Sequence, residues 1–592
     1  MLKYYYVLFF ALCFSIVPGK VRSQALIAGK EMFLAKSDSF IPAMMKKYGM
    51  VGFSMAVVDA EEPVIYKNYG YENLERKITA SENTVYRIAS VSKVFTAMAV
   101  MKLRDEGKID LNAPIENYLK GLHLHYAPGL PIITIHDLLT HTSGLPDNID
   151  NGSLCANAPD QESIISETNK LYLTIPAGLK MNYSNTGYAL LGCLVEKISG
   201  EKFPDYLEHN FFSPMQMAHT GFLKAGEIIQ HAAAGYLADS TFFDEPVLRD
   251  IAAGGVYSSA SDLTHLCSLL LDAGRVNGKQ VIASATLQEM MTNKISEVKL
   301  ASDDEFGYGL FIHELGSDKD SLIGKNIGHG GDSRVFHSIV VTFPALNIGF
   351  VLLTNSESGG AFTKSAVLQI AREYIRDVKG IAIQKGTKND FTATALRVDN
   401  LNNAMIEGTY GSGGEDFVTM IRKNDGKLVF RQDKTKLVLK KDEAGVYSVK
   451  YMLLKFIPVK VKAASFGFRL VDDRIYMKAI DNKSKSAEYI SVKDNQIVMP
   501  ESWKLKVGKY SIDNLCSGNM LMYPDEIKIA GNKLLLHRSD PLKEEDDIIS
   551  FNIINDHIAV SDGIDRGAGN SLELLPNGNI YWSGYEMKPV KE

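Results

Sequence analysis

The chain carries the stretch YRIASVSKVFTAM at Tyr86–Met98, in which Ser90 and Lys93 are three residues apart. The segment Val94–Leu103 is apolar and compatible with a helix, which Gly107 can end. A helix that begins near Ser90 places the hydroxyl and the amine on one face, because residues at i and i+3 are neighbours. The positive end of the helix dipole disfavours a second positive charge there, so Lys93 can take a proton from Ser90 and make it a nucleophile.

The pattern Ser-x-x-Lys is weak evidence by itself. It occurs again at Ser199–Lys202 and at Ser296–Lys299, in segments typical of surface helix or loop. Without partners elsewhere in the chain, the better interpretation of Ser90 is a helix N-cap beside a solvated lysine.

A second candidate cluster lies in Met181–Tyr188, with the sequence MNYSNTGY. Tyr183 and Asn185 are two residues apart, so both side chains can point to one side of an extended or turn segment before an apolar helix. A phenol beside an ammonium can lose its proton and relay it between nucleophile and leaving group. Asn185 offers an amide to a substrate carbonyl or to Lys93. The alternative is a turn rich in Asn and Ser with a half-buried tyrosine.

A third cluster is the glycine-rich segment Ile327–Asp332, with the sequence IGHGGD, followed by two apolar runs typical of a β-hairpin. A glycine-rich strand lets a substrate lie against its backbone and exposes N–H groups to an oxyanion. His329 could orient a substrate carboxylate or bond the tyrosine. Taken singly, a histidine in such a strand is more often structural.

In this order and spacing, the three clusters resemble the motifs of the serine β-lactamase and penicillin-binding-protein superfamily. The similarity covers roughly residues 35–378 and includes the segments TIHDLLTHTSGLP at Thr134–Pro146 and AGGVYS at Ala253–Ser258. The nearest groups are class C β-lactamases, DD-peptidases, D-aminopeptidases and esterases of that fold. The resemblance implies an α+β fold of the class C type, with an antiparallel sheet and a helical lobe.

The resemblance also implies a role for each matching residue. Ser90 is the acylated nucleophile, Lys93 the amine that assists it, and Tyr183 the general base. The substrate-binding residues are Asn185, His329, Gly331 and Asp332, with the oxyanion hole formed by the backbone N–H groups of Ser90 and Asp332.

The third cluster departs from the family pattern, because His329–Gly331 replaces the Lys-Thr-Gly of β-lactamases and many penicillin binders. Loss of the lysine and of the threonine hydroxyl disfavours recognition of a penicillin carboxylate. A D-amino-acid peptide or a small ester is therefore the expected substrate, with β-lactamase activity still open. The alternative is a catalytically silent receptor for peptidoglycan fragments on the same fold. Arg334 is expected to be a surface arginine on a strand edge; the alternative is that it binds a substrate carboxylate.

Residues 1–23 have the pattern of a signal peptide: Lys3 precedes an apolar run, and a cut is expected before Gln24. The sequence thus predicts an exported protein, periplasmic or secreted, without stable membrane insertion after cleavage. Four cysteines follow, too few for a disulfide scaffold, and their pairing is left open: Cys155, Cys193, Cys267 and Cys516.

The net charge of −6 without a basic cluster argues against nucleic-acid binding. His136 and His141 lack the further ligands that zinc requires, so neither a metal nor an organic cofactor is expected. The expected partner is a small-molecule or peptide substrate. The sequence gives no oligomeric state.

A change of pattern near residue 380 divides the chain. The expected hydrolase domain is 24–378, followed by a polar linker at 379–402. Short alternating runs with turn signals then predict an all-β region with two barrel-like units, 403–500 and 501–592. A faint repeat, Ile406–Tyr410 and Lys506–Tyr510, opens the two units.

Overall fold

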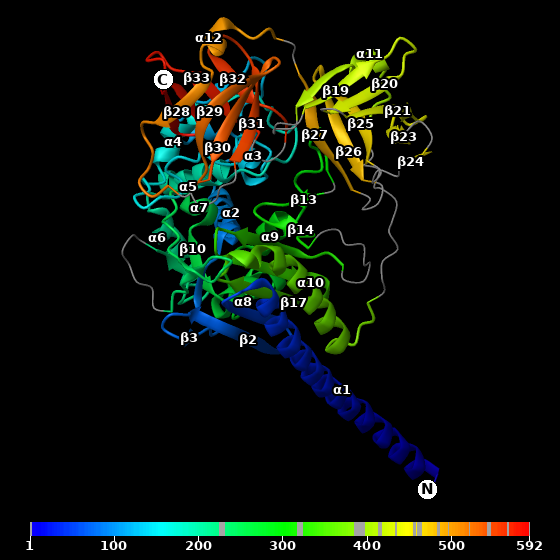
Figure 1. Cartoon of the computed structure of the whole chain (residues 1–592). Coiled ribbons are helices and arrows are strands. Elements are labelled where there is room, and N and C mark those ends of the chain that lie inside the picture. Colours follow the sequence, from blue (N-terminus) through cyan, green and yellow to red (C-terminus); the bar gives the residue numbers. More distant parts are fainter. Residues whose placement is uncertain are drawn as a thin grey trace.

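An antiparallel sheet of eight strands forms the centre of the N-terminal domain (Figure 1). The computed structural model describes residues 3–590 except 224–230, 303, 316–323, 384–396, 412–416, 433–434, 451, 454–456, 459–463, 482–485, 495–496, 520, 541–545 and 565–567. Across the sheet the strands are β13 (Glu305–Phe306), β14 (Phe311–Ile312), β15 (Ile327–Asp332), β16 (His337–Phe343), β17 (Ile348–Thr354), β1 (Gly52–Asp59), β2 (Glu62–Asn73) and β3 (Ile78–Thr79).

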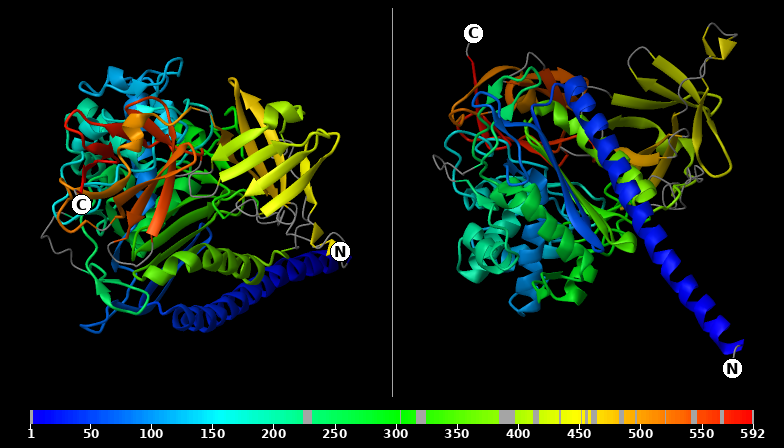
Figure 2. Two further views of the ribbon diagram at one scale, coloured as in Figure 1. Left: turned by 45° about the horizontal axis from the view of Figure 1, so that its top comes forward. Right: turned by 90° about the horizontal axis from the view of Figure 1, so that it is seen from below.

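Both faces of this sheet are covered, because β1, β16 and β17 are buried along their whole length. Successive side chains of a strand point to opposite faces. Phe53, Met55 and Val57 pack with helices α1 (Lys3–Tyr48) and α10 (Gly360–Asp377), which lie side by side in Figure 2. Ala56 and Val58 belong instead to the core on the other side, where α8 (Ala260–Leu271) packs.

A helical lobe inserted between the strands holds α2 (Ser92–Asp105) at its centre. Eleven of its fourteen residues are buried, as expected of a helix that is covered on all sides. The other helices of the domain are α3 (Ile135–Leu139), α4 (Ser163–Thr168), α5 (Asn185–Ser199), α6 (Phe203–Leu207), α7 (Ile251–Gly254) and α9 (Ser284–Met290). The expected α+β fold, a sheet with a helical lobe, is confirmed.

Short strands complete the domain. A three-stranded sheet contains β4 (Val85–Arg87), β10 (Val256–Ser259) and β7 (Gly221–Phe222). Three small pairs are β5 (His125–Tyr126) with β6 (Tyr172–Leu173), β8 (Gly235–Tyr236) with β9 (Phe242–Phe243), and β11 (Arg275–Val276) with β12 (Lys279–Gln280).

The C-terminal region is all-β and forms two closed barrels. The first contains β18 (Gly408–Gly411), β19 (Phe417–Arg422), β20 (Leu428–Gln432), β21 (Thr435–Lys441), β22 (Tyr447–Lys450), β25 (Ala464–Val471), β26 (Arg474–Asp481) and β27 (Ser486–Lys493). Between β22 and β25 lies the hairpin of β23 (Met452–Leu453) and β24 (Ile457–Pro458). Helix α11 (Asn403–Ile406) precedes this barrel.

The second barrel follows α12 (Glu501–Lys504). It contains β28 (Gly508–Ile512), β29 (Tyr523–Ala530), β30 (Lys533–Ser539), β31 (Asp546–Ile553), β32 (Ile558–Ser561), β33 (Ser571–Leu574), β34 (Ile580–Trp582) and β35 (Tyr585–Pro589). The faint repeat marks the first strand of each barrel. The Tyr410 hydroxyl donates to the carbonyl of Ile406 at 2.8 Å, and that of Tyr510 to Lys506 at 2.6 Å.

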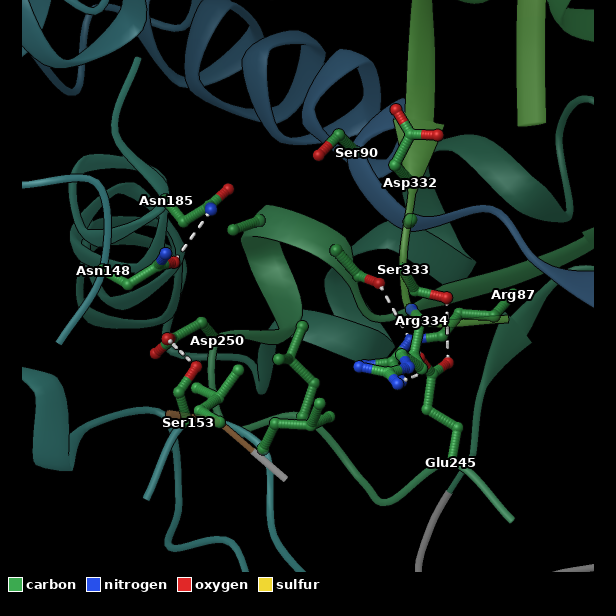
Figure 3. Close-up of a pocket in the computed structure, with 16 residues that line it drawn as sticks. Arg87, Ser90, Asn148, Ser153, Asn185, Glu245, Asp250, Asp332, Ser333 and Arg334 are labelled. Carbon is green, nitrogen blue, oxygen red and sulfur yellow. Dashed lines mark hydrogen bonds and ion pairs between the residues drawn. The ribbon is translucent and has the colours of Figure 1, made fainter. Parts of the chain in front are cut away.

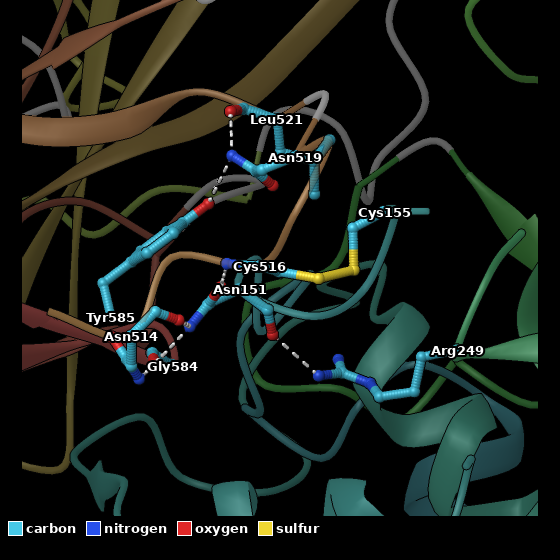
Figure 4. The surroundings of a disulfide bond; sticks show 9 residues. All are labelled: Asn151, Cys155, Arg249, Asn514, Cys516, Asn519, Leu521, Gly584 and Tyr585. Atoms are coloured by element: carbon cyan, nitrogen blue, oxygen red, sulfur yellow. Dashed lines mark hydrogen bonds between the residues drawn. A yellow bond between two sulfur atoms is a disulfide. The ribbon is translucent and has the colours of Figure 1, made fainter. Parts of the chain in front are cut away.

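A disulfide between Cys155 and Cys516 joins the second barrel to the helical lobe (Figure 4). Around it the side chain of Asn151 donates to the carbonyl oxygens of Asn514 at 3.0 Å and Gly584 at 2.9 Å. The second barrel is thus fixed to the lobe both covalently and by hydrogen bonds.

The helix α1 contains the segment expected to be a signal peptide, residues 1–23, of which the structure describes residues 3–23 as helix. Its later part packs on the sheet through Phe33, Ile41 and Met45. Among the described residues, none of the helices combines the length and apolar character needed to cross a membrane.

Candidate active site

Ser90 lies in a short 3-10 turn, Ala89–Val91, directly before α2. The sequence predicts a helix from near Ser90, whereas the α-helix begins two residues later, at Ser92, and the turn carries the serine. Ala89 has a φ of 43°, a left-handed conformation that is strained for a residue with a side chain. This sharp turn leaves Ser90 half-buried among buried neighbours, close to Asp332 at the end of β15 (Figure 3).

Three oxygen atoms surround the fully buried amine of Lys93. Its Nζ lies 3.1 Å from Ser90 Oγ, 2.6 Å from Asn185 Oδ1 and 2.7 Å from the carbonyl oxygen of Ala253. An ammonium donates one hydrogen to each oxygen. A neutral amine donates to Asn185 and Ala253 and turns its lone pair to the Ser90 hydroxyl. The same geometry therefore serves both protonation states, and a proton can pass from Ser90 to Lys93 without any movement of the nitrogen.

Tyr183 lies beside this amine, with its ring centre 4.8 Å from Lys93 Nζ. On its other side the ring packs on His141 at 4.2 Å between centres. The backbone around the tyrosine is bound to the same histidine: Asn182 N donates to the His141 carbonyl at 2.7 Å and Ser184 N to Nδ1 at 3.0 Å. His141 thus positions the tyrosine segment.

Asn185 is the first residue of α5, and both the oxygen and the nitrogen of its side-chain amide form hydrogen bonds within the protein. Its oxygen accepts from Lys93, and its amide nitrogen donates to Asp147 Oδ1 at 3.0 Å. The same nitrogen donates to Asn148 Oδ1 at 2.9 Å (Figure 3). Helix α5 is held in place by its N-cap Ser184, whose hydroxyl accepts from Gly187 N at 3.0 Å. Of the two roles predicted for Asn185, the structure shows the one toward Lys93.

Gly331 brings strand β15 against the backbone of the nucleophile. A Cβ atom at this position would lie 2.1 Å from the Ile88 carbonyl oxygen and 3.0 Å from Ser90 N, so no larger residue fits. The Ser338 hydroxyl donates to the same carbonyl at 2.7 Å. Asp332, the next residue of β15, consequently lies beside Ser90, where the two backbone N–H groups of the expected oxyanion hole belong (Figure 3).

His329 is a neutral ring in this site. Burial, and secondarily the charge of Lys93, lower the pKa of His329 to about 3. Its Nδ1 lies 2.5 Å from the carbonyl oxygen of Gly330, so Nδ1 carries the hydrogen and Nε2 is an acceptor. This Nε2 is buried and has no hydrogen-bond partner among the described residues. His329 therefore offers an acceptor rather than a positive charge.

Two cavities meet at Ser90 and Asp332. One, of about 300 Å³, is bordered by Asn148, Asn185 and Leu521; we call it the Asn185 cavity. The other, of about 450 Å³, is bordered by Tyr183, His329 and Glu488; we call it the Tyr183 cavity. Leu521 comes from the second barrel region and Glu488 from β27 of the first.

Glu245 fixes the chain that follows β15. Its carboxylate accepts from the guanidinium of Arg87 at 3.0 Å, from the Ser333 hydroxyl at 3.0 Å and from Arg334 N at 2.8 Å. The side chain of Arg334 forms ion pairs with Glu357 and with Asp540 of the second barrel region. It is half-buried and paired, whereas the sequence indicates an exposed arginine on a strand edge.

Sequence reasoning missed several residues of this site: Asp147, Asn148, His141, Glu245, Glu488 and Leu521. His141 lies within the segment 134–146 that carries the resemblance, which is the one signal available for it. Glu488 and Leu521 enter the site only through the docking of the barrels.

The comparison with protein families gives one match that covers more than half of the chain. Residues 38–373 match the family model described as Beta-lactamase. A curated relative is Protein flp of Staphylococcus aureus (strain NCTC 8325 / PS 47), 27% identical over 335 residues, which are 54% of this chain and 63% of that protein. The match therefore spans less than two thirds of that relative's length.

Solved structures with the same fold align with more of the chain than residues 38–373. The octameric penicillin-binding protein homologue from Pyrococcus abyssi aligns with a TM-score of 0.51 and 24% identity, over 78% of this chain and 100% of that one. The crystal structure of SurE with D-Leu aligns with a TM-score of 0.54 and 18% identity, over 79% and 100%. At these identities the likeness concerns the fold. By the match of residues 38–373, together with the fold, this chain belongs to the β-lactamase family of serine hydrolases related to penicillin-binding proteins.

Proposed function

We propose that this protein is an exported serine hydrolase that forms an acyl-enzyme on Ser90. Ser90 Oγ attacks the substrate carbonyl carbon while its proton passes to the Lys93 and Tyr183 pair. The backbone N–H groups of Ser90 and Asp332 stabilise the oxyanion, an effect worth about 3 kcal/mol in such sites. The pair returns the proton to the leaving group as the tetrahedral intermediate collapses, and water then hydrolyses the acyl-enzyme.

The position of Lys93 carries this proposal. Its nitrogen is buried, lies 3.1 Å from the nucleophile and is held by two further oxygens from α5 and α7. A serine beside a solvated lysine would show neither the burial nor the two additional contacts, so the simple N-cap interpretation does not account for the geometry.

The electrostatics of the Tyr183 cavity support a substrate other than a β-lactam. Four acidic side chains border it against two lysines: Asp304, Glu314, Asp332 and Glu488 against Lys180 and Lys364. His329, in the place where many relatives have a lysine, is neutral. A carboxylate on the leaving side would meet net negative charge, so a D-amino-acid peptide without a carboxylate there, or a small ester, fits better.

Export of the protein is part of the proposal. The N-terminal residues have the signal-peptide pattern, and a disulfide joins Cys155 to Cys516. Disulfides form and persist in the periplasm and outside the cell, which agrees with that pattern.

The test is intact-mass spectrometry of the full-length protein after exposure to a fluorophosphonate and, in parallel, to a penicillin. Wild type is expected to gain one fluorophosphonate adduct, and Ser90→Ala none. Ser333→Ala, which removes another hydroxyl of the same site, is expected to keep the adduct. A stable penicilloyl adduct on Ser90 would place the protein among penicillin binders and contradict the substrate preference. Wild type that accepts neither reagent would overturn the hydrolase proposal in favour of a receptor.

A further inference from the structure

The two cavities receive different parts of a substrate, and this assignment rests on the proposed function. The group that protonates the leaving group must touch it, and Tyr183 borders only the larger cavity. The leaving group therefore occupies the Tyr183 cavity. The acyl group, which remains on Ser90, occupies the Asn185 cavity.

The charged side chains of the Asn185 cavity are paired within the protein. Arg87 binds Glu245, Asp250 accepts from Arg249 at 2.7 Å, and Asp332 accepts from His337 Nδ1 at 2.8 Å. The apolar part of the wall consists of Leu154, Leu248 and Leu521 together with Ala89 and Ala253. A charged acyl group would find no free counter-charge on this wall, so an uncharged apolar acyl group suits it best.

The chain that leads to Leu521 is fixed to the lobe and to the second barrel by several contacts. The carbonyl oxygen of Leu521 accepts from the Asn519 amide at 2.7 Å, and the same amide contacts the Tyr585 hydroxyl at 3.3 Å (Figure 4). Upstream, the disulfide fixes Cys516 to Cys155, the residue after Leu154 of the same wall. Ala156 N also donates to the carbonyl of Ser517 at 3.0 Å. The leucine is therefore part of a fixed wall.

We infer that Leu521 is a specificity-determining residue that limits the length of the acyl group, so that the enzyme selects short, uncharged, apolar acyl groups. The cavity volume of about 300 Å³ is at the lower end for ligand sites, in agreement with a short group. The second barrel thereby sets acyl selectivity from outside the β-lactamase domain.

The test is the hydrolysis of p-nitrophenyl esters from acetate to octanoate by the full-length, disulfide-bonded protein. Leu521→Ala is expected to raise kcat/KM for hexanoate and octanoate about tenfold relative to acetate, and Leu521→Trp to lower it. Leu515→Ala is the matched control, because Leu515 lies in the same segment but is 44% exposed and does not border the cavity. The dependence of its kcat/KM on the length of the acyl group, its chain-length profile, is expected to equal that of wild type.

The outcomes separate this inference from the proposed function. If wild type hydrolyses the esters through Ser90 and all four proteins share one chain-length profile, the role of Leu521 is overturned while the hydrolase stands. If Ser90→Ala retains full activity, or no ester is cleaved, both are overturned. Formation of the Cys155–Cys516 bond, checked by mass after alkylation, shows that each variant has folded.

Discussion

At the level of single side chains, His329 distinguishes this site from that of the β-lactamases. It lies on β15 against the ring of Phe311, at 5.2 Å between centres, and 2% of it is exposed. Because its ring is neutral, the strand presents a hydrogen-bond acceptor where the family pattern has a cation. A substrate carboxylate at this position would therefore meet no positive charge on the residue.

The buried ring of His329 makes stability depend on pH. The pKa of His329 is about 3 in the folded protein and 6.5 when the chain is unfolded, so between these values only the unfolded state binds the proton. The contribution of His329 to stability is fully present above pH 6.5. As the pH falls toward 3, the free energy of unfolding decreases by up to about 1.4 kcal/mol per pH unit. Between pH 7.5 and pH 5.5, the free energy of unfolding measured in urea is expected to decrease less for His329→Gln than for wild type.

Replacement of the exposed His123 by glutamine is the control for that measurement. It is expected to keep the wild-type pH dependence. An equal loss of stability in wild type and His329→Gln would show that the buried ring does not govern this pH range.

At the level of secondary-structure elements, the site depends on how closely β15 approaches the turn that carries Ser90. Gly331 provides this approach, and Glu245 holds the chain beyond the strand. The proposed oxyanion hole would thus be formed by two elements that are about 240 residues apart in sequence, brought together by packing of backbone against backbone.

Gly331→Ala is expected to slow phosphonylation of Ser90 by a fluorophosphonate about 100-fold or more, because its Cβ would meet Ile88 O at 2.1 Å and displace the strand. The rate of mass gain measures this. Gly330→Ala is the matched control, since its Cβ meets no backbone atom closer than 3.8 Å and only the end of the Glu314 side chain at 3.0 Å, so the loss should be much smaller. Equal rates for the two variants would contradict the packing argument.

The sequence predicts those parts of the site that local geometry decides. The spacing of Ser90 and Lys93 becomes proximity on any helical turn, and the hairpin after the glycine-rich β15 follows from two apolar runs joined by a turn. The 3-10 turn at Ala89 is not predictable, since its strained φ is imposed by packing. His141, Asn148 and Leu521 reach the site through loops whose positions depend on contacts distant in sequence.

At the level of the whole molecule, three units contribute to one active site. The first barrel supplies Glu488 to the Tyr183 cavity, and the second supplies Leu521 to the Asn185 cavity. A cluster that includes Leu179, Tyr489 and Ile564 packs the domain and both barrels together. Both barrel regions therefore border the candidate site, and under the proposed function their removal is expected to change its selectivity.

The Cys155–Cys516 bond closes a loop with a sequence separation of 361, and long loops give large stabilisation by constraining the unfolded chain. Reductant is expected to lower the Tm of wild type but not that of the Cys155→Ser/Cys516→Ser double variant. Loss of the disulfide should lower the free energy of unfolding by about 2–4 kcal/mol, measured by scanning calorimetry. Cys193 and Cys267 are buried, and burial raises the pKa of Cys267 to about 12, so these thiols should not interfere. Equal Tm values for oxidised wild type and the double variant would contradict this prediction.

The separation of the two bonded cysteines also sets the order in which the enzyme matures. Cells extend a polypeptide at about 5–20 residues per second, so the 361 positions from Cys155 to Cys516 take roughly 20 to 70 seconds to synthesise. During this interval Cys193 and Cys267 can become buried in the growing core, while Cys155 waits for a partner that does not yet exist. On the proposed assignment, Ser90, Lys93 and Tyr183 are synthesised before Leu521, so a newly made chain is expected to gain reactivity first and discrimination last.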